Sequence, residues 1–283
     1  MIVLILIVLG LCFGSFVNAT VWRIHEQKAL KQKPKRGSKK PALTAKELSI
    51  SKGRSMCTHC HHVLAAKDLI PVLSWVELRG KCRYCGKRIE DTPLAELLTP
   101  LLFVISYLWW PTTFTTMQTV NFVMWCVALV GFVALMIYDI RWLTLPNRIV
   151  YPLTVLAAGV AILNITVFHG GMSSLKDIGF AVLIDAGLFY GLFQLSKGKW
   201  IGGGDVKLGL LLGLLIAAPI PAFLVLFFAS LIGTVLILPG LITKKVTAKS
   251  HIPFGPFLII ATIIVRLFGA GIVAWYKKKF LLY

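Results

Sequence analysis

The sequence predicts an all-α protein that crosses a membrane about eight times and carries a small cytoplasmic domain between its first two spans. Of the 283 residues, 57% are hydrophobic and only 14% are charged, with a mean hydropathy of +0.81. A soluble domain carries roughly a quarter charged residues. The apolar residues gather in blocks of about 20, which is the length that a helix needs to cross the hydrocarbon core. A basic segment that contains four cysteines follows the first block.

Eight apolar segments are expected to form the spans, and each follows from its length and its flanking polar residues. The first lacks a basic start and a small-residue cleavage site, so it is expected to be a retained span rather than a signal peptide. Pro219 and Pro221 end the sixth, and its closeness to the seventh leaves a re-entrant pair as an alternative. The segments are 1–22, 94–111, 119–138, 148–168, 177–195, 206–218, 222–242 and 254–276.

The distribution of charge predicts the orientation of the chain. Residues 23–93 hold 17 of the 30 Lys and Arg residues but 6 of the 11 acidic ones, which gives this segment a net charge of +11. The positive-inside rule places such a segment in the cytoplasm and the N-terminus outside. The uncharged loop 112–118 fits the outside, whereas the basic tail 277–279 falls outside against the rule. Beside membrane spans, contact with anionic lipid is expected and binding to nucleic acid is not.

The spacing of four cysteines predicts a structural zinc site in this segment. Cys57-x-x-Cys60 is followed after 21 residues by Cys82-x-x-Cys85, and two such knuckles supply four thiolates for a tetrahedral ion. A reducing cytoplasm disfavours disulfides; a redox dithiol or no metal are the alternatives. His59, His61 and His62 lie beside the first knuckle and are not expected to be ligands. The chain then divides into a first span at 1–22, a basic insertion (26–54) with a four-cysteine zinc domain within 23–93, and a membrane core at 94–283.

The acidic residues of the membrane core are few and therefore informative. Five lie outside the basic segment: Glu96, Asp139, Asp177, Asp185 and Asp205. The predicted topology places Asp139, at the end of the third span, and Asp205, at the start of the sixth, on the cytoplasmic membrane edge. Two neighbouring carboxylates can share a proton and activate water. The alternative is two unrelated acids at helix ends that pair with Arg141 and Lys207.

The residues around Asp205 strengthen its candidacy. Gly202, Gly203 and Gly204 precede it directly, and glycines let backbone and substrate approach closely. Lys207 lies two positions after Asp205 and belongs to the same candidate loop. Asp185 and Arg266 lie within predicted spans, where we expect them to pair because buried charges in a membrane usually do.

These motifs resemble those of the type IV prepilin peptidases over nearly the whole chain. The similar stretches occur in the same order as in that family, which a chance match would not produce. They are Gly14-Ser15-Phe16-Val17-Asn18, Arg54-Ser55-x-Cys57 through Cys85-Gly86 to Pro93 and Glu96, Asp139 with Leu145-Pro146-Asn147, Gly202 to Leu208, and Pro253-Phe254-Gly255-Pro256. The long insertion at 26–54 and His25, where a proline is expected, are departures from the pattern.

The resemblance implies a bifunctional enzyme in the bacterial cytoplasmic membrane, with its active site on the cytoplasmic side. Such an enzyme cuts the basic leader from prepilins or pseudopilins and methylates the new N-terminal amine with S-adenosylmethionine. The family's catalytic pair falls on Asp139 and Asp205, and its zinc-type cysteines on Cys57, Cys60, Cys82 and Cys85. Glu96 is a candidate for the methyl-transfer site. The sequence itself does not locate the S-adenosylmethionine site or give the oligomeric state.

Three other functions remain as alternatives. A peptidase without methyltransferase activity would share the aspartates. A transporter would place its polar groups near the membrane midplane, whereas Asp139 and Asp205 are expected at the edge. A zinc-containing anchor that binds nucleic acid would leave both aspartates without a role.

Overall fold

The computed structural model describes residues 1–31, 43–89, 92–167, 171–244 and 252–280. Within these ranges the regular structure is helical, and the extended pairing is limited to isolated bridges. The chain forms two compact units, Met1–Ile105 and Ser106–Tyr283, which are described separately. The predicted all-α class is confirmed.

The first unit is built on α1 (Ile2–Lys31) and the start of α3 (Leu94–Leu108). Two glycines of α1 permit a close crossing, since a Cβ atom on Gly10 would lie 2.4 Å from the Cα atom of Pro100. A Cβ atom on Gly14 would lie 2.5 Å from the carbonyl oxygen of Ala95. Small residues allow helices in a membrane to approach in this way, so the position of Glu96 beside α1 follows from Gly14.

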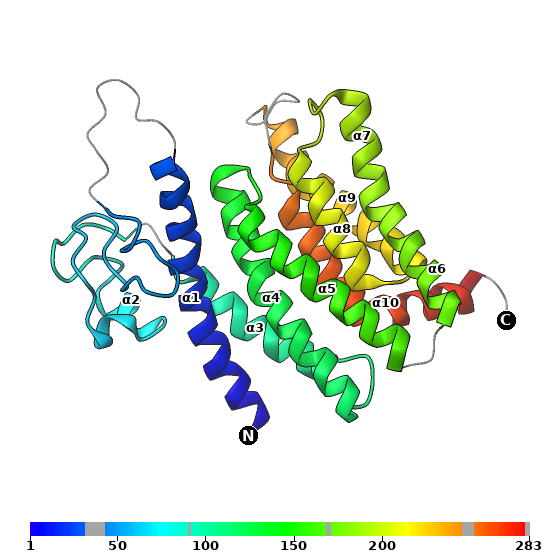
Figure 1. Cartoon of the computed structure of the whole chain (residues 1–283), viewed down its shortest axis with the longest axis horizontal. Coiled ribbons are helices and arrows are strands. Elements are labelled where there is room, and N and C mark those ends of the chain that lie inside the picture. Colours follow the sequence, from blue (N-terminus) through cyan, green and yellow to red (C-terminus); the bar gives the residue numbers. More distant parts are fainter. Residues whose placement is uncertain (32–42, 90–91, 168–170, 245–251, 281–283) are drawn as a thin grey trace. The chain divides into compact units, whose positions relative to one another are not determined.

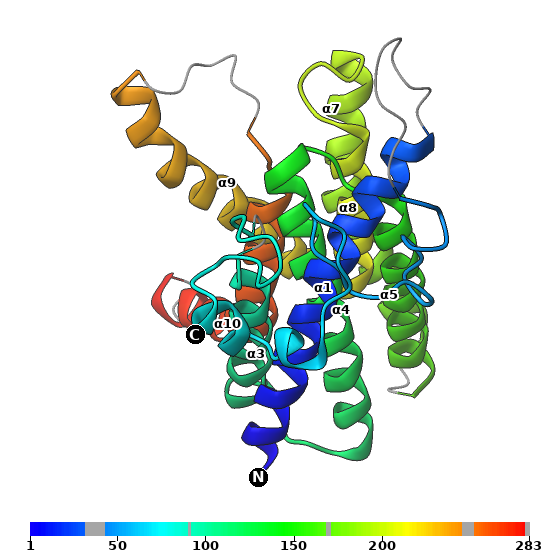
Figure 2. The same ribbon diagram turned by 90° about the vertical axis from the view of Figure 1, so that its left-hand side faces the viewer.

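The cytoplasmic part of the first unit is mostly turns, with two short helices, η1 (Ala66–Leu69) and α2 (Leu73–Glu77). It lies beside the C-terminal half of α1 (Figures 1 and 2). The guanidinium of Arg23 donates hydrogen bonds to the carbonyl oxygens of Ser49, Ile50 and Gly53. The side chain of Leu48 is completely buried.

The expected mobile insertion at 26–54 is therefore only partly described. Residues 26–31 continue α1 and residues 43–54 form a turn region that packs on Arg23. Arg23 and Leu48 connect the turn region to α1, and the expected mobility stays a prediction. The remainder, 32–42, lies outside the described residues.

The second unit is a bundle of long helices around α8 (Gly203–Ile216). Its other helices are α4 (Thr116–Trp142), α5 (Asn147–Val167), α6 (Gly171–Val182), the π-helical turn η2 (Leu183–Gly187), α7 (Leu188–Ser196), α9 (Pro219–Ile242) and α10 (Gly255–Phe280). α8 packs against α5, α6 and η2, and α10 packs against α9 and α4. A Cβ atom on Gly209 would lie 2.6 Å from the carbonyl oxygen of Asp185, so α8 approaches the π-helical turn closely through this glycine.

Six of the described helices are long and apolar enough to cross a membrane: Ile2–Lys31, Thr116–Trp142, Asn147–Thr166, Met172–Ser196, Pro219–Ile242 and Gly255–Phe280. A helix occupies each of the eight expected segments, but α3 has 15 residues and α8 has 14. Both are shorter than the roughly 20 residues of a perpendicular span. A multi-pass protein is confirmed, whereas the count of eight stays a prediction.

The predicted pair of Asp185 and Arg266 is wrong. Asp185 is 1% exposed in η2, and neither of its carboxylate oxygens has a hydrogen-bond partner. The guanidinium of Arg266 instead lies 5.1 Å from the centre of the Trp110 ring. An aromatic face attracts a cation, so Trp110 takes the place that was expected for the carboxylate.

Candidate active site and metal centre

Asp139 lies in the last turn of α4, where its carboxylate faces the first residue of α10. The residue is 5% exposed. Its carboxylate accepts a hydrogen bond from the backbone N–H of Gly255, and a Cβ atom on Gly255 would lie 2.7 Å from its Oδ2 atom. The N-terminus of a helix favours a negative group. α10 therefore holds the Asp139 carboxylate at the end of α4, and only glycine fits at the contact.

Asp205 lies in the first turn of α8, after the three glycines. Gly202 is the N-cap of this helix, and its backbone N–H donates to the Asp205 carboxylate. The Asp205 N–H in turn donates to the Gly202 carbonyl oxygen over 3.1 Å. This reciprocal pattern resembles a capping box, which satisfies the free donors at the start of a helix. The side chain of Asp205 is therefore fixed by its own helix end.

The two carboxylates lie near each other, close enough for their charges to interact. Leu145, in the loop after α4, packs between the two glycine positions that border them. A Cβ atom on Gly204 would lie 3.3 Å from the Leu145 Cβ atom, and one on Gly255 would lie 3.6 Å from a Leu145 methyl group. The ends of α4, α8 and α10 thus meet around two acidic side chains, which can share one proton and polarise a water molecule and a carbonyl group.

Lys207 belongs to the same turn of α8 but contacts α5. Its ammonium donates to the Asn147 side-chain oxygen over 2.9 Å and lies 5.6 Å from the centre of the Tyr151 ring. These contacts join the start of α8 to the start of α5. The alternative in which Lys207 neutralises Asp205 has no support among the described contacts.

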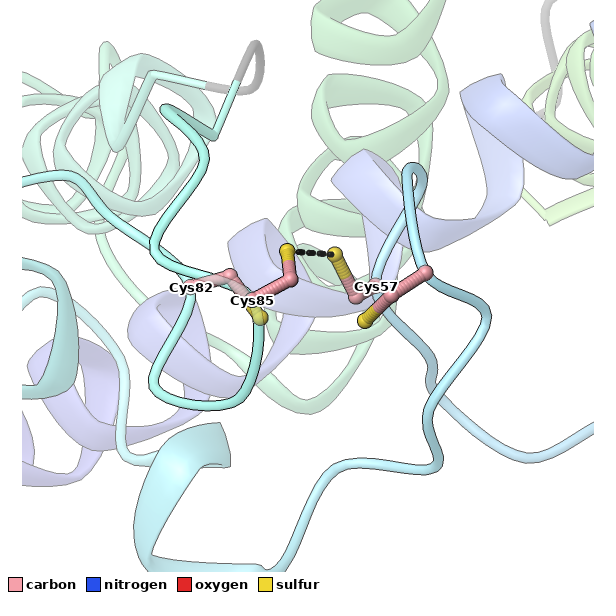
Figure 3. Close-up of side chains that lie close together, drawn as sticks. Cys57, Cys82 and Cys85 are labelled. Atoms are coloured by element: carbon pink, nitrogen blue, oxygen red, sulfur yellow. Dashed lines mark hydrogen bonds between the residues drawn. The ribbon is translucent and has the colours of Figure 1, made fainter.

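The four predicted cysteines come together in the first unit, on two loops that share one local structure. The Sγ atoms of Cys57, Cys60, Cys82 and Cys85 all lie within 4.8 Å of one another. Figure 3 shows the sulfur atoms of Cys57 and Cys85 facing each other, at 3.9 Å. A tetrahedral zinc with Zn–S bonds near 2.3 Å separates its sulfur atoms by about 3.8 Å, so these residues fit that ion.

The two knuckles have matching hydrogen bonds. The Cys57 N–H donates to the His62 carbonyl oxygen and the Cys82 N–H donates to the Lys87 carbonyl oxygen. His61 and Gly86 follow their knuckles at equivalent positions, and both have a positive φ, 55° and 69°. The isolated bridges Met56↔Val63 and Lys81↔Arg88 close the two loops in the same way.

Electrostatics at Cys82, though not at its neighbour Cys85, favour a metal-binding thiolate. Burial raises the pKa of the Cys82 thiol, but hydrogen bonds from the backbone N–H groups of Cys85 and Tyr84 and from neighbouring thiols lower it to about 7. Zinc binds the thiolate form. The three histidines lie outside the four-sulfur group: the His59 ring contacts the Arg88 carbonyl oxygen at 3.1 Å, and the His62 ring lies 3.7 Å from that of Tyr84.

Glu96, in the first turn of α3, holds the turn before α2. Its Oε2 atom accepts a hydrogen bond from the Val72 N–H over 2.7 Å. Val72 has φ 61° and ψ −49°, a strained conformation for a β-branched residue. The 2.6 Å hydrogen bond from the Leu73 N–H to the Pro71 carbonyl oxygen closes a γ-turn around it. The structure thus brings Glu96 to the cysteine-containing domain of its own unit.

Sequence reasoning gave no role to three residues that the structure places at these sites. Gly255, Leu145 and Asn147 had been noted within motifs, but their contacts with Asp139, Gly204 and Lys207 depend on the bundle. The Pro-rich start of α10 was the available signal for Gly255, since it marks a helix N-terminus. Val72 had no signal, because its strain depends on backbone geometry.

Comparisons with known proteins match both units of the chain. Residues 8–110 match the Bacterial Peptidase A24 N-terminal domain, and residues 126–238 match the Type IV leader peptidase family. The chain is similar to proteins named prepilin leader peptidase/N-methyltransferase: 35% identical to that of Aeromonas hydrophila, over 81% of this chain and 76% of the relative. It is 30% identical to the protein of that name from Bacillus subtilis, over 82% of this chain and 88% of the relative. It is 32% identical to that of Stutzerimonas stutzeri, over 98% of this chain and 94% of the relative. No solved structure matches.

Proposed function

Because the chain belongs to the type IV prepilin peptidase family, we propose that it is a membrane-embedded aspartic endopeptidase and N-methyltransferase. It removes the short basic leader from type IV prepilins or pseudopilins, and it methylates the new N-terminal residue with S-adenosylmethionine. The observation that supports the peptidase half most directly is the closeness of the Asp139 and Asp205 carboxylates. They lie at the ends of α4 and α8, and the start of α10 contacts Asp139 through Gly255. The earlier resemblance to this family is confirmed by the comparisons.

In the proposed cleavage, Asp139 and Asp205 share one proton. The ionised carboxylate accepts a proton from the attacking water while the protonated one donates to the scissile carbonyl oxygen. When the tetrahedral intermediate collapses, the proton taken from water passes to the leaving amine. The proton on the former carbonyl oxygen returns to the other aspartate, which restores the pair to its starting state. Gly202, Gly203 and Gly204 leave room for the substrate backbone, and the Gly255 N–H holds Asp139 in place. Lys207 positions the start of α8 through Asn147.

The two implied groups have different tasks. Cys57, Cys60, Cys82 and Cys85 would hold a structural zinc ion, which crosslinks two loops that have few apolar side chains to bury. S-adenosylmethionine supplies an activated methyl group when bound. Glu96 is the candidate residue for methyl transfer, because it lies in the first turn of α3 and its carboxylate accepts a hydrogen bond from Val72 of the cytoplasmic domain.

The proposed topology has eight spans in the bacterial cytoplasmic membrane, with the N-terminus outside. The zinc domain within 23–93 and the aspartate pair then face the cytoplasm, where prepilin leaders are found. The net charge of +11 on 23–93 supports contact with anionic lipid at that face. Nucleic acid is not proposed as a partner.

The test is cleavage of a prepilin-type peptide by purified protein in detergent, with the product mass recorded after S-adenosylmethionine is added. Asp139→Asn and Asp205→Asn are each expected to lower cleavage by at least about 10³-fold, as loss of an essential acid or base does. Asp177→Asn, an exposed acid of α6, is the matched control and is expected to cut normally. Normal cleavage by either dyad variant would show that the pair is not catalytic.

The second candidate function, cleavage without methylation, is separated by the same experiment. Methylation adds one CH₂ to the mass of the product. A wild-type product that lacks this increase would leave the peptidase half standing alone. The four clustered cysteines favour the bifunctional enzyme, because the aspartate pair needs no second domain in order to cut.

A further inference from the structure

A cavity in the first unit has none of the residues proposed for cleavage in its lining. Its volume is about 160 Å³, and it is bounded by α1, the cysteine knuckles, α2 and the start of α3. α1 contributes one face, with Ser15, Asn18, Ala19, Trp22 and Arg23 at helical spacing. Cys57 and Cys82 form part of another wall. All of the residues that line it belong to the first unit, so the cavity is complete without the second.

The charged groups of this cavity differ in how many of their hydrogen-bonding atoms already have a partner. Asp68 is saturated: its Oδ1 accepts from Arg83, and its Oδ2 accepts from the Tyr84 hydroxyl and the Ala65 N–H. The Arg23 donors are directed to the carbonyl oxygens of the 49–53 turn. Glu96 is different, because its described hydrogen bond uses only Oε2. Its Oε1 accepts no hydrogen bond among the described contacts, and Glu96 is one of the residues that line the cavity.

Two tryptophans contribute to the walls of this cavity. Trp22 comes from α1 and Trp75 from α2, and both line the same cavity as Glu96. A carboxylate combined with aromatic faces forms an environment that selects a cation. The cavity volume is below the roughly 300–1,000 Å³ of pockets that enclose a drug-sized ligand, so it would enclose only part of a nucleoside-containing ligand.

We propose that this cavity binds the sulfonium-bearing methionine end of S-adenosylmethionine, between Trp22 and Trp75, with the positive charge facing Glu96. The inference rests on the proposed methyltransferase function and gives it a location. The donor's adenosine then extends out of the cavity. Transfer breaks the bond from sulfur to methyl and forms a bond from nitrogen to methyl, and the sulfur leaves with the electron pair as a neutral thioether.

Glu96 has a second task in this arrangement, through its other oxygen. The hydrogen bond from the Val72 N–H to Oε2 holds a γ-turn in a strained conformation. α2 begins directly after this turn and carries Trp75. Glu96 therefore positions one aromatic wall with Oε2 and leaves Oε1 for the cation. The substitution Glu96→Gln separates these tasks, because a glutamine oxygen still accepts from Val72 but carries no charge.

The experiment measures binding by calorimetry on full-length protein in detergent, with S-adenosylmethionine and its neutral product S-adenosylhomocysteine as probes. The wild type is expected to bind the cation about tenfold more tightly than the neutral sulfide, which corresponds to about 1.4 kcal/mol. Glu96→Gln is expected to lose this preference, with an unchanged circular-dichroism spectrum as the check that the variant is folded. Trp22→Leu and Trp75→Leu are expected to weaken binding of S-adenosylmethionine by about tenfold or more.

Matched controls come from outside the cavity. Glu77→Gln changes an exposed acid of α2, and Trp275→Leu changes an exposed tryptophan of α10; both are expected to bind as the wild type does. If Glu96→Gln keeps the preference and the two cavity tryptophan variants bind normally, the cavity is not the donor site, although methylation by the wild type still stands. If the wild type cuts but neither binds the donor nor methylates, the methyltransferase half of the proposed function fails together with this inference.

Discussion

At the scale of single residues, the contact between Gly255 and Asp139 sets the shape of the proposed catalytic site. The glycine does two things there: its N–H donates to the carboxylate, and its missing side chain leaves room for Oδ2. A carboxylate at the start of a helix is stabilised by about 0.3–1 kcal/mol at exposed sites, and more when it is partly buried. The N-terminus of α10 thus acts on a residue more than a hundred positions earlier in the chain.

A single methyl group at this position is expected to displace the carboxylate. In Gly255→Ala, the new Cβ would lie 2.7 Å from Oδ2, which is too close for the native arrangement. The turnover number for cleavage is expected to fall about 10²-fold, as a displacement of about 1 Å can cause, with a smaller change in KM. Steady-state kinetics on a prepilin-type peptide measure both.

Gly271→Ala is the control for this substitution, since it lies in the same helix and a Cβ there meets nothing within 4 Å. Alanine is the better helix former by about 1 kcal/mol, so this variant is expected to cut normally and to be slightly more stable. Equal activity of the two variants would show that the position of Asp139 does not depend on Gly255.

At the scale of elements, the two knuckles are a repeated device with different residues at the turn. His61 and Gly86 occupy equivalent positions with positive φ. Histidine tolerates this conformation better than most residues do, whereas a β-branched residue is strained there. The structure therefore places a backbone requirement directly beside the metal ligands.

Gly86→Val tests that requirement in isolation, because a Cβ at Gly86 has nothing within 4 Å. Any effect must come from the backbone. The folded knuckle is expected to lose about 1–2 kcal/mol, the cost of a left-handed conformation for a residue with a side chain. Zinc affinity, measured by competition with a chelator, would fall by about tenfold. Gly86→Asn is expected to lose less, and an equal loss for both variants would contradict the conformational explanation.

The elements also show what sequence patterns can predict and what they cannot. Apolar length located a helix at each expected position, and the Cys-x-x-Cys spacing located the cluster of thiols, because both depend on local chemistry. The interaction partner of the Arg266 guanidinium could not be predicted in this way. Trp110 and Asp185 were both available partners, and only the packing of α10 decides between them. The strained turn at Val72 and the cavity likewise arise from long-range contacts.

At the scale of the whole molecule, the topology remains to be measured. Six helices are long enough to span, and α3 and α8 are short. If both cross, the loops alternate as the distribution of Lys and Arg predicts, with 112–118 outside. Glycine-mediated close crossings at α3 and α8 are compatible with short spans packed inside a bundle.

Labelling with a membrane-impermeant thiol reagent distinguishes the possibilities. Thr113→Cys is expected to react in intact spheroplasts, whereas Lys199→Cys is expected to react only after the membrane is permeabilised; both native residues are exposed. The reason is the preference of Lys and Arg for the cytoplasmic side. Labelling of Lys199→Cys from outside would overturn the proposed orientation, and the unsubstituted chain gives the background.

The sharing of Cys57 and Cys82 between the metal cluster and the cavity wall has a consequence for the cell. Two ligands whose sites share residues are thermodynamically linked, and the linkage is reciprocal. If the cysteine cluster holds zinc and the cavity holds the donor, we expect each to raise the affinity for the other by the same factor. The aspartate pair belongs to the other unit and shares no residue with either site. A bacterium starved of zinc would therefore continue to release mature pilin subunits, but with unmethylated amino termini. The fraction of methylated subunits would then depend on the zinc supply of the cell.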